Sequence, residues 1–480
     1  MAYFFLHFAI TAWPFLNFYG SETNHKLVSL ESFSVLFLIF WGGAILACEL
    51  LKRILKTTSE RILVGYAFFI LLFFSYTPYK SFSIAIHLPK PSYLFVFIVF
   101  LVIFVTYKLS KFTAFQKAVQ LCIVVIFSFS FIENIFISLK KEKISSQVVK
   151  RDVPSYVFKE RPNIYFLLLD TYPHSDVLKK NIQYENTEFV SFFKNKGFIV
   201  AENSYSNYPH TTASLSATLQ MNFLVAGDEH DVFAPDKAVL NILKKNNYKF
   251  VSLPGYYDFL IPKNSADILI SPSSNILFSL TNVNFLQTTI LQVFSGLITH
   301  FLYFGNNEIK KIFQLSKKES KFVFIHFLHL HDFIYGKNCT TSFRLTASKR
   351  NNEEFQTNLS CINAFAEETI NEIMTHDPES IIIVQGDHAP FWWRKEEEKV
   401  TSLENFDLMF SIFSAVYIPG LDKNSPIAQY LADSPSPVNN FRVIFSYLAK
   451  TPLELLPSRH FDDKLRELTH FRSHPENAVR

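Results

Sequence analysis

Five apolar stretches in the first third of the chain constrain its fold more than any other feature. A helix needs about 20 apolar residues to cross the roughly 30 Å of hydrocarbon in a bilayer. The stretches reach this length or come close to it, and they run from Ala2 to Tyr19, Ser29 to Leu51, Ile62 to Tyr76, Ser92 to Tyr107 and Phe115 to Ile137. Because a chain in lipid must satisfy its backbone hydrogen bonds internally, they predict a domain of five transmembrane helices.

Cations cluster at two of the turns between these stretches. Four lie between the second and third stretches and three lie around the turn before the fifth: Lys52, Arg53, Lys56 and Arg61, then Lys108, Lys111 and Lys117. Loops with an excess of Lys and Arg stay in the cytoplasm, so both turns are predicted to be cytoplasmic. Five helices that start inside place the rest of the chain in the periplasm or outside the cell. We therefore expect a multi-pass protein of the inner, cytoplasmic membrane.

A basic segment follows the fifth stretch, with cations at Lys140, Lys141, Lys143, Lys150 and Arg151. The positive-inside rule favours few cations on the outer side, so a helix count that is off by one would invert the orientation. The segment is expected either to lie on anionic lipid head groups or to be a solvated linker. These patterns predict a transmembrane domain over residues 1–138, a juxtamembrane linker over 139–154 and a second domain over 155–480.

Short apolar runs alternate with helical stretches in the second domain. The runs are rich in β-branched and aromatic residues and cover Ile164 to Leu169, Lys249 to Leu253, Phe322 to His326, Ser380 to Gln385 and Ala415 to Ile418. Such alternation predicts an α/β sandwich, with a largely parallel central sheet covered by helices. The net charge of +4 is spread along the chain without a basic stripe, which argues against nucleic-acid binding.

Two of the predicted strands end in potential metal ligands. The first continues into Asp170, and the fourth continues through a glycine into Asp387 and His388. Open parallel sheets place their sites at the carboxyl ends of strands. Carboxylate and imidazole groups together suit Zn²⁺ or Mn²⁺. Taken alone, Asp170 could instead cap the helix that follows it.

Hydroxyl and imidazole groups gather in two further segments. Asn207 to Leu219 is rich in Ser and Thr and is typical of a helix start, where free backbone N–H groups and the helix dipole favour an anionic substrate. A hydroxyl that only caps the helix is the alternative. The third predicted strand contains or runs into His326, His329, His331 and Asp332. Alternation along that strand places some of these imidazoles in the core and others at its mouth.

The order of these segments resembles that of the alkaline phosphatase and sulfatase superfamily. A strand that ends in Asp, a hydroxyl at a helix start, a His-rich strand and a late Asp-His pair follow one another over roughly the last two thirds of the chain. Within the superfamily the chain is most similar to membrane-anchored, sulfatase-like proteins related to lipoteichoic acid synthases and lipid A phosphoethanolamine transferases. In those proteins several N-terminal helices precede an exported catalytic domain.

The resemblance implies a single divalent metal ion, zinc or manganese in the first place and calcium or magnesium as alternatives. Its ligands would be Asp170, Thr211, Asp387 and His388. Thr211 would also be the nucleophile. The family's nucleophile is typically followed three positions later by Ser, and Ser214 satisfies that spacing from Thr211 and not from Thr212.

The resemblance also implies which groups surround the substrate. His331 stands five positions after His326, where the family places a His that faces the transferred group. His331 would protonate the leaving oxygen or bind the substrate, with His326 behind it. Ser214 and His210 are expected to contact the substrate as well.

The chain departs from the family in two places. Formylglycine sulfatases need Cys or Ser in a C-x-P-S-R type sequence, whereas Thr211 begins Thr-Thr-Ala-Ser-Leu, so a formylglycine mechanism is excluded. Asp170 is followed by Thr171 and not by a second acid, and the late Asp-His pair leads into Ala-Pro-Phe-Trp-Trp-Arg in place of a Gly-Glu. A site for one cation is therefore expected, without the second metal of a full cluster.

The four cysteines fall into two groups. Cys48 and Cys122 lie inside apolar runs, whereas Cys339 and Cys361 lie close to each other in the polar second half. Export of that half would allow Cys339 and Cys361 to form a disulfide. Two unpaired thiols are the alternative.

These features predict a membrane-anchored, metal-dependent enzyme that transfers or hydrolyses a phosphoryl group, of phosphoethanolamine or phosphoglycerol type, through a Thr nucleophile. Anchoring raises the local concentration of membrane substrates, so a membrane lipid or cell-envelope glycan is the expected partner. A sulfate-ester hydrolase on the same fold and a non-catalytic envelope scaffold that retains the fold are the alternatives.

Overall fold

The structure is a computed structural model of the whole chain. It describes residues 2–20, 30–75, 79, 91–144, 155–226, 237–253, 265–270, 285, 306–328, 330, 334–335, 338–339, 341–342, 352–390, 393 and 403–468. The chain forms two compact units, Met1–Gln147 with Ser273–Leu302, and Val148–Pro272 with Tyr303–Arg480. Residues 273–302 thus group with the first unit, although they lie within the predicted second domain. The boundaries predicted at residues 138 and 154 stay predictions.

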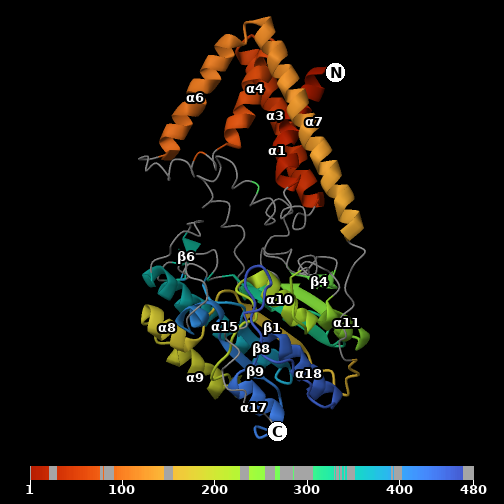
Figure 1. Cartoon of the computed structure of the whole chain (residues 1–480), viewed down its shortest axis with the longest axis vertical. Coiled ribbons are helices and arrows are strands. Elements are labelled where there is room, and N and C mark those ends of the chain that lie inside the picture. The colour runs from red at the N-terminus through yellow and green to blue at the C-terminus, as the bar shows by residue number, and fades with distance from the viewer. Residues whose placement is uncertain are drawn as a thin grey trace. The chain divides into compact units, whose positions relative to one another are not determined.

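Long helices build the described part of the first unit (Figure 1). They are α1 (Ala2–Gly20), α3 (Leu30–Ile54), α4 (Ser59–Phe73), α6 (Pro91–Leu109) and α7 (Thr113–Ile144). Each overlaps one of the five predicted apolar stretches. Phe33–Ile54 and Thr113–Phe136 are long and apolar enough to cross a membrane, and Leu94–Leu109 is a shorter apolar helix. The number of helices that cross the membrane stays a prediction.

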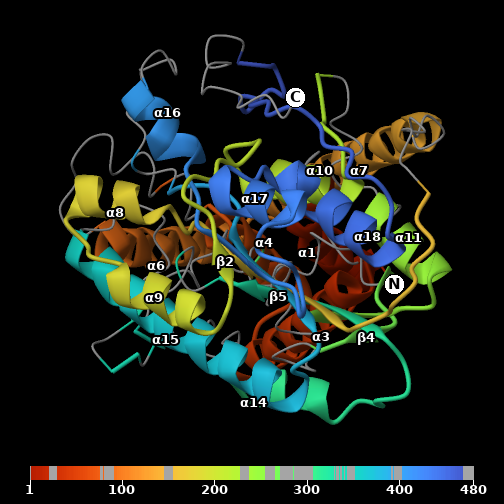
Figure 2. The same ribbon diagram turned by 90° about the horizontal axis from the view of Figure 1, so that it is seen from below.

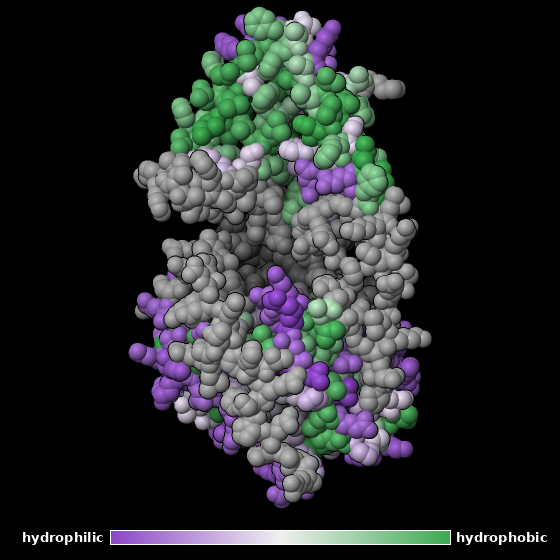
Figure 3. Space-filling view, in the orientation of Figure 1, coloured by the Kyte–Doolittle hydropathy of each residue, from purple (hydrophilic) through white to green (hydrophobic). Residues whose placement is uncertain are grey.

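Apolar side chains cover most of the described surface of this unit on the face that the upper part of Figure 3 shows. Phe97 and Phe100 on α6 and Phe129 and Phe136 on α7 are each more than 60% exposed. Large contiguous apolar surfaces are rare on proteins that are surrounded by water. This surface suits contact with lipid chains.

An aromatic cluster inside the first unit joins distant parts of the chain. Phe285 is buried, and its ring centroid lies 4.2 Å from that of Phe15 and 5.2 Å from those of Phe33 and Phe74. A residue from the middle of the sequence therefore packs among the N-terminal helices, which accounts for its grouping with them.

A seven-stranded sheet forms the centre of the second unit, in the order β2-β9-β8-β1-β5-β3-β4. Its strands are β1 (Ile164–Leu169), β2 (Ile199–Val200), β3 (Lys249–Leu253), β4 (Ile268–Leu269), β5 (Lys321–Phe327), β8 (Ile381–Gly386) and β9 (Ser414–Tyr417). The strands from β8 to β4 are mutually parallel, whereas β9 is antiparallel to both β8 and β2. The sheet is thus mixed but largely parallel, as predicted.

Helices cover both faces of this sheet (Figure 2). One face carries α8 (Ser175–Ile182), α9 (Thr187–Asn195), α14 (Asn306–Phe313) and α15 (Asn352–His376), and the other carries α10 (Thr211–Gln220), α11 (Ala238–Lys245), α17 (Pro426–Asp433) and α18 (Asn440–Ala449). Alternate residues of β1 divide between the two cores, with Tyr165 and Leu167 on the first side and Ile164 and Phe166 on the second. Burial on both faces explains why the central strands are continuous apolar runs.

The remaining described elements lie at the margins of the second unit. They are β6 (Ile334–Tyr335), β7 (Thr341–Ser342), α16 (Leu403–Phe410) and a 3₁₀ turn over Pro437–Asn439. The strands β6 and β7 pair as an antiparallel ribbon. A disulfide joins Cys339, between these two strands, to Cys361 on α15, so the structure contains the bridge that export of this half would allow.

Candidate metal centre

The register of the sheet places two carboxylates side by side. Leu169, the last residue of β1, pairs with Gly386, the last residue of β8, so Asp170 and Asp387 leave neighbouring strands at the same edge. Both are almost completely buried, at 1% and 0% exposure. Their proximity therefore follows from strand pairing, and no loop is needed to bring them together.

The turn after β1 holds Asp387 from the other side. The backbone N–H of Thr171 donates to Asp387 Oδ1 over 2.9 Å. Thr171 has a φ of +58°, in the left-handed region that a β-branched residue rarely occupies. Strained backbone of this kind is concentrated at functional sites, where the surrounding structure enforces it.

Gly386 allows the two strand ends to approach this closely. A Cβ atom at position 386 would collide with the backbone carbonyl oxygen of Tyr172. The backbone N–H of Gly386 donates to the Phe413 carbonyl oxygen over 2.8 Å. Only a residue without a side chain fits between β8 and the turn after β1. The glycine in the Gly-Asp-His sequence is therefore a packing requirement of the site.

His388 is held with one ring nitrogen free for coordination. Its Nδ1 lies 2.8 Å from the carbonyl oxygen of Ala389, which can only accept, so Nδ1 carries the proton. In the neutral ring, the lone pair of Nε2 then faces the carboxylates, 3.6 Å from Asp387 Oδ2 and 3.9 Å from Asp170 Oδ1. Ligating histidines are commonly oriented by such a bond from the other ring nitrogen.

Thr211 completes the cluster from the start of α10. Its Oγ1 lies 3.1 Å from His388 Nε2 and 3.4 Å from Asp170 Oδ2. As the first residue of the helix it stands where backbone N–H groups lack intrahelical partners and the helix dipole is positive. A hydroxyl in this position adjoins a natural binding site for an anion.

The electrostatics of the cluster favour a cation. Burial, and secondly the negative charge of Asp170, raise the pKa of Asp387, whereas His388 and the Thr211 hydroxyl act in the opposite direction. Asp387 Oδ2 is buried and has no hydrogen-bond partner within the part of the chain that the structure describes. A divalent cation would neutralise both carboxylates and occupy this oxygen.

The geometry also fits a cation. Ligand atoms of Asp170, Asp387 and His388 all lie within 4.8 Å of one another. Bonds of about 2.1 Å to a tetrahedral zinc ion place the ligand atoms about 3.4 Å apart. The distances of 3.1 to 3.9 Å given above lie around that value, and the mixture of carboxylate, imidazole and hydroxyl suits Zn²⁺ or Mn²⁺.

His326 supports the cluster from β5. It pairs with Leu168 of β1 in the sheet, and its Nε2 lies 2.9 Å from Asp170 Oδ2. Because a carboxylate only accepts, His326 Nε2 is the donor, and the bond fixes the orientation of Asp170. His326 thus contacts Asp170, which is a predicted metal ligand. The predicted contact of His326 with the substrate stays a prediction.

The other predicted residues are placed as follows. Ser214 is buried in the first turn of α10, and its hydroxyl has no partner within the described residues. His210 precedes the helix and is partly exposed, and its Nδ1 lies 3.4 Å from Asp463 Oδ1. His331 lies outside the described residues. Their predicted roles toward the substrate stay predictions.

Sequence reasoning missed two contributors to the site, Thr171 and Gly386. Nothing in the residue type of Thr171 indicates a left-handed backbone, because β-branched residues rarely adopt one. Gly386 carried a signal, since glycine at the end of a strand indicates a close approach of backbones.

No family model matches the chain, and no curated protein sequence matches it. Among solved structures the chain is similar to the C-terminal periplasmic domain of EcEptC from Escherichia coli in complex with Zn, with 12% identity and a TM-score of 0.44 over 66% of this chain and 90% of that one. It is also similar to the corresponding domain of the phosphoethanolamine transferase EptC from Campylobacter jejuni, with 11% identity and a TM-score of 0.41 over 62% and 97% of the two chains. A protein in the alkaline phosphatase superfamily from Vibrio parahaemolyticus matches with 11% identity and a TM-score of 0.39 over 64% and 73%. A phosphoethanolamine transferase and a protein of the alkaline phosphatase superfamily are thus among the structures to which this chain is similar.

Proposed function

We propose that this chain is a membrane-anchored, metal-dependent phosphoryl-group transferase or phosphodiester hydrolase with Thr211 as its nucleophile. Asp170, Asp387, His388 and the Thr211 hydroxyl would hold one divalent cation. The substrate would be a cell-envelope lipid or glycan that carries a phosphodiester, of phosphoethanolamine or phosphoglycerol type.

One observation carries the proposal. Thr211 Oγ1 stands within 3.4 Å of both His388 Nε2 and Asp170 Oδ2, at the N-terminus of a ten-residue helix. A Thr that only capped the helix would direct its hydroxyl to a backbone N–H two or three residues ahead. Here the hydroxyl is directed to groups from two different strands.

The chemistry follows from this placement. A Thr hydroxyl is scarcely ionised at neutral pH, and a bound divalent cation would supply the positive charge that lowers the free energy of ionising it. Thr211 Oγ would then form a bond to phosphorus while the bond from phosphorus to the leaving oxygen breaks. Backbone N–H groups at the start of α10 would stabilise the negative charge on the phosphoryl oxygens.

The second half of the reaction releases the enzyme. An acceptor hydroxyl or water would attack the phosphorylated Thr211, and the Thr211 oxygen would leave. The leaving oxygen of the first step needs a proton, and His331 is the residue that the sequence resemblance offers for it.

Intact-mass analysis of the full-length protein in detergent tests the proposal directly. The protein would be incubated with Zn²⁺ or Mn²⁺ and phosphatidylethanolamine or phosphatidylglycerol, quenched in acid and digested to locate any adduct. We expect a phosphoethanolamine or phosphoglycerol adduct on Thr211, formed only with metal.

Thr211→Ala should abolish the adduct, whereas the neighbouring Thr212→Ala serves as the matched control and should retain it. An adduct that persists in Thr211→Ala, or a preference for sulfate esters over phosphodiesters in a hydrolysis assay, would contradict the proposal.

A further inference from the structure

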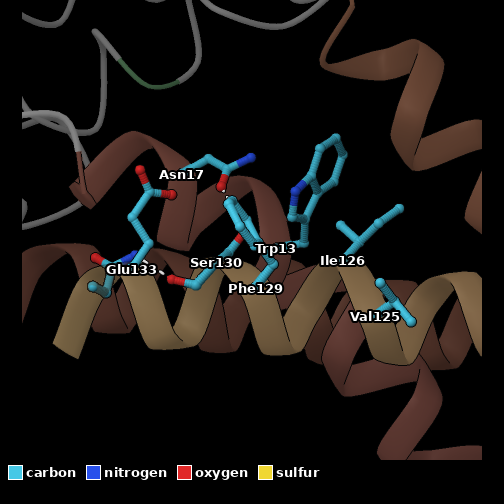
Figure 4. Close-up of a pocket in the computed structure, with 8 residues that line it drawn as sticks. Trp13, Asn17, Val125, Ile126, Phe129, Ser130 and Glu133 are labelled. Atoms are coloured by element: carbon cyan, nitrogen blue, oxygen red, sulfur yellow. Dashed lines mark hydrogen bonds between the residues drawn. The ribbon is translucent and has the colours of Figure 1, made fainter. Parts of the chain in front are cut away.

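Buried polar side chains form hydrogen-bond networks in both units. In the first unit such a network lies between α1 and α7, beside a cavity of about 640 Å³ (Figure 4). Ser130 Oγ donates to Asn17 Oδ1 over 2.7 Å, and Asn134 Nδ2 donates to the carbonyl oxygen of Leu16 over 3.1 Å. Contacts of this kind commonly join neighbouring membrane helices. The network in the second unit differs, because it reaches the metal centre through Tyr172.

Tyr172 forms a closed ring of hydrogen bonds with two asparagines. Its hydroxyl donates to Asn363 Oδ1 over 2.6 Å, Asn363 Nδ2 donates to Asn186 Oδ1 over 3.0 Å, and Asn186 Nδ2 donates back to the hydroxyl over 3.0 Å. Asn363 lies on α15 and Asn186 precedes α9, so the ring joins two helices to the turn after β1. Tyr172 is completely buried, and hydrogen bonds between buried groups are costly to leave unmade.

The backbone and the aromatic ring of Tyr172 are held as well. Its N–H donates to the carbonyl oxygen of Leu169, and its carbonyl oxygen accepts from the N–H of Phe413, each over 3.2 Å. Its ring centroid lies 5.7 Å from that of Phe413. Tyr172 is thus fixed at one end of the turn, and Leu169 is fixed at the other by its pairing in the sheet. Asp170 and Thr171 must close the turn between them.

This closure explains the left-handed backbone of Thr171. Thr171 is the third residue of the turn that the bond from Tyr172 to Leu169 closes, and type II turns, which need a positive φ at that place, usually have Gly or Asn there. The φ of Thr171 is +58°. Because this region is unfavourable for a β-branched residue, Thr171 would relax to a negative φ if Tyr172 were released. The Thr171 N–H, which donates to Asp387 Oδ1 over 2.9 Å, would then turn away.

We propose that Tyr172 is a positioning residue for Asp387. Its hydrogen-bond ring holds Thr171 in the left-handed conformation, in which the Thr171 N–H binds Asp387 Oδ1 and leaves Oδ2 to the cation. Tyr172 acts through Thr171 and contacts neither metal nor substrate. The inference rests on the metal centre of the proposed function and adds a residue that controls its geometry.

Calorimetric titration of the full-length protein in detergent with Zn²⁺ tests the proposal. Tyr172→Phe keeps the aromatic ring and removes the hydroxyl, and Zn²⁺ affinity should fall about tenfold, as expected for groups that orient metal ligands. Asn363→Ala removes another member of the hydrogen-bond ring and should act in the same way. Tyr184→Phe is the matched control, because the Tyr184 hydroxyl lies 3.4 Å from Asn363 Nδ2 but outside the ring, and it should retain the wild-type affinity.

Thr171→Gly distinguishes positioning from a general loss of structure. Glycine adopts a positive φ without strain, so the turn no longer depends on the hydrogen-bond ring. Tyr172→Phe should therefore weaken Zn²⁺ binding much less in the Thr171→Gly background than in the wild type, which makes the two substitutions non-additive. An equal loss in both backgrounds, or wild-type affinity in Tyr172→Phe, would overturn the proposal.

Thermal unfolding of the metal-free protein provides a second readout, which requires neither metal nor phosphoryl transfer. Thr171→Gly relieves strain in the wild type, but in Tyr172→Phe the strain is already released, so the change in unfolding temperature should be less favourable there. The added freedom of the unfolded glycine chain is the same in both backgrounds and cancels. Equal changes would overturn the role of Tyr172. The expected changes without an adduct on Thr211 would contradict the proposed function and leave this role standing.

Discussion

At the scale of single residues, Asp387 is the group that a metal ion would change most. Burial and the charge of Asp170 raise its pKa above the ordinary value of 3.8. In the pH range between the unfolded and folded pKa values, the folded state binds more protons than the unfolded state. In the metal-free protein, the contribution of Asp387 to stability should therefore fall as the pH rises above about 4.

Asp387→Asn distinguishes the destabilisation that the buried Asp387 charge causes without metal from the stabilisation that metal binding provides. At neutral pH the variant should unfold at a higher temperature than the metal-free wild type, because a neutral amide replaces a buried carboxylate. Wild type should gain about 2.7 kcal/mol when the free metal is 100 times its dissociation constant, and the variant should gain almost nothing. Thermal unfolding with and without Zn²⁺ measures both effects, and a variant that is stabilised by metal as strongly as the wild type would exclude Asp387 as a ligand.

His326 should act on the metal through Asp170. His326→Leu removes the donor and should weaken metal affinity by about 10- to 100-fold, as expected for groups that orient ligands. His326→Gln keeps a donor close to the position of Nε2 and should recover part of the affinity. Calorimetric titration of both variants with Zn²⁺ checks this order. Equal affinities for the two would mean that the hydrogen bond does not position Asp170.

At the scale of elements, the site is produced by strand pairing. Leu169 of β1 pairs with Gly386 of β8. The carboxylates that follow these residues, Asp170 and Asp387, therefore lie at the same edge of the sheet. The parallel partner β5 adds His326 beside Leu168. Helix α10, which lies between β1 and β8 in the sequence, then supplies the hydroxyl of Thr211.

Gly386→Ala should disrupt this arrangement. The new Cβ would meet the Tyr172 carbonyl, and either β8 or the turn after β1 would have to move. Overpacking of this kind costs about 1–3 kcal/mol, and metal affinity should fall with it because Thr171 would no longer hold Asp387. Chemical denaturation and metal titration check both. Gly65→Ala, where the structure leaves open space for the Cβ, is the control.

The strands that carry the ligands were predictable, whereas their pairing was not. The predicted runs at 164–169 and 249–253 coincide with β1 and β3, since burial on both faces leaves a continuous apolar signature. The two-residue strands β2 and β4 were missed because two residues show no periodicity. That Asp170 would face Asp387 depends on which strands are neighbours, and this information lies in contacts far apart in sequence.

At the scale of the whole molecule, the five apolar stretches were visible in the sequence because each is long and contains few charged residues. The grouping of Ser273–Leu302 with the N-terminal helices was not foreseen. The buried aromatic contacts of Phe285 are tertiary, so local composition does not indicate them. The chain passes from one unit to the other three times, so neither unit is one continuous segment of the sequence.

The predicted orientation can be tested with two single-cysteine reporters in cells. Cys48 and Cys122 would be replaced by Ser, and Cys would then be placed either at Thr57, in the turn between α3 and α4, or at Val157, which is 71% exposed at the start of the second unit. Because the basic turn is predicted to be cytoplasmic, a membrane-impermeant maleimide should label position 157 in intact spheroplasts and reach position 57 only after lysis. The Cys339–Cys361 disulfide should stay unlabelled in both states, which provides an internal control. The opposite labelling pattern would place the metal centre in the cytoplasm, where that disulfide would be reduced and a substrate of the outer leaflet would be out of reach.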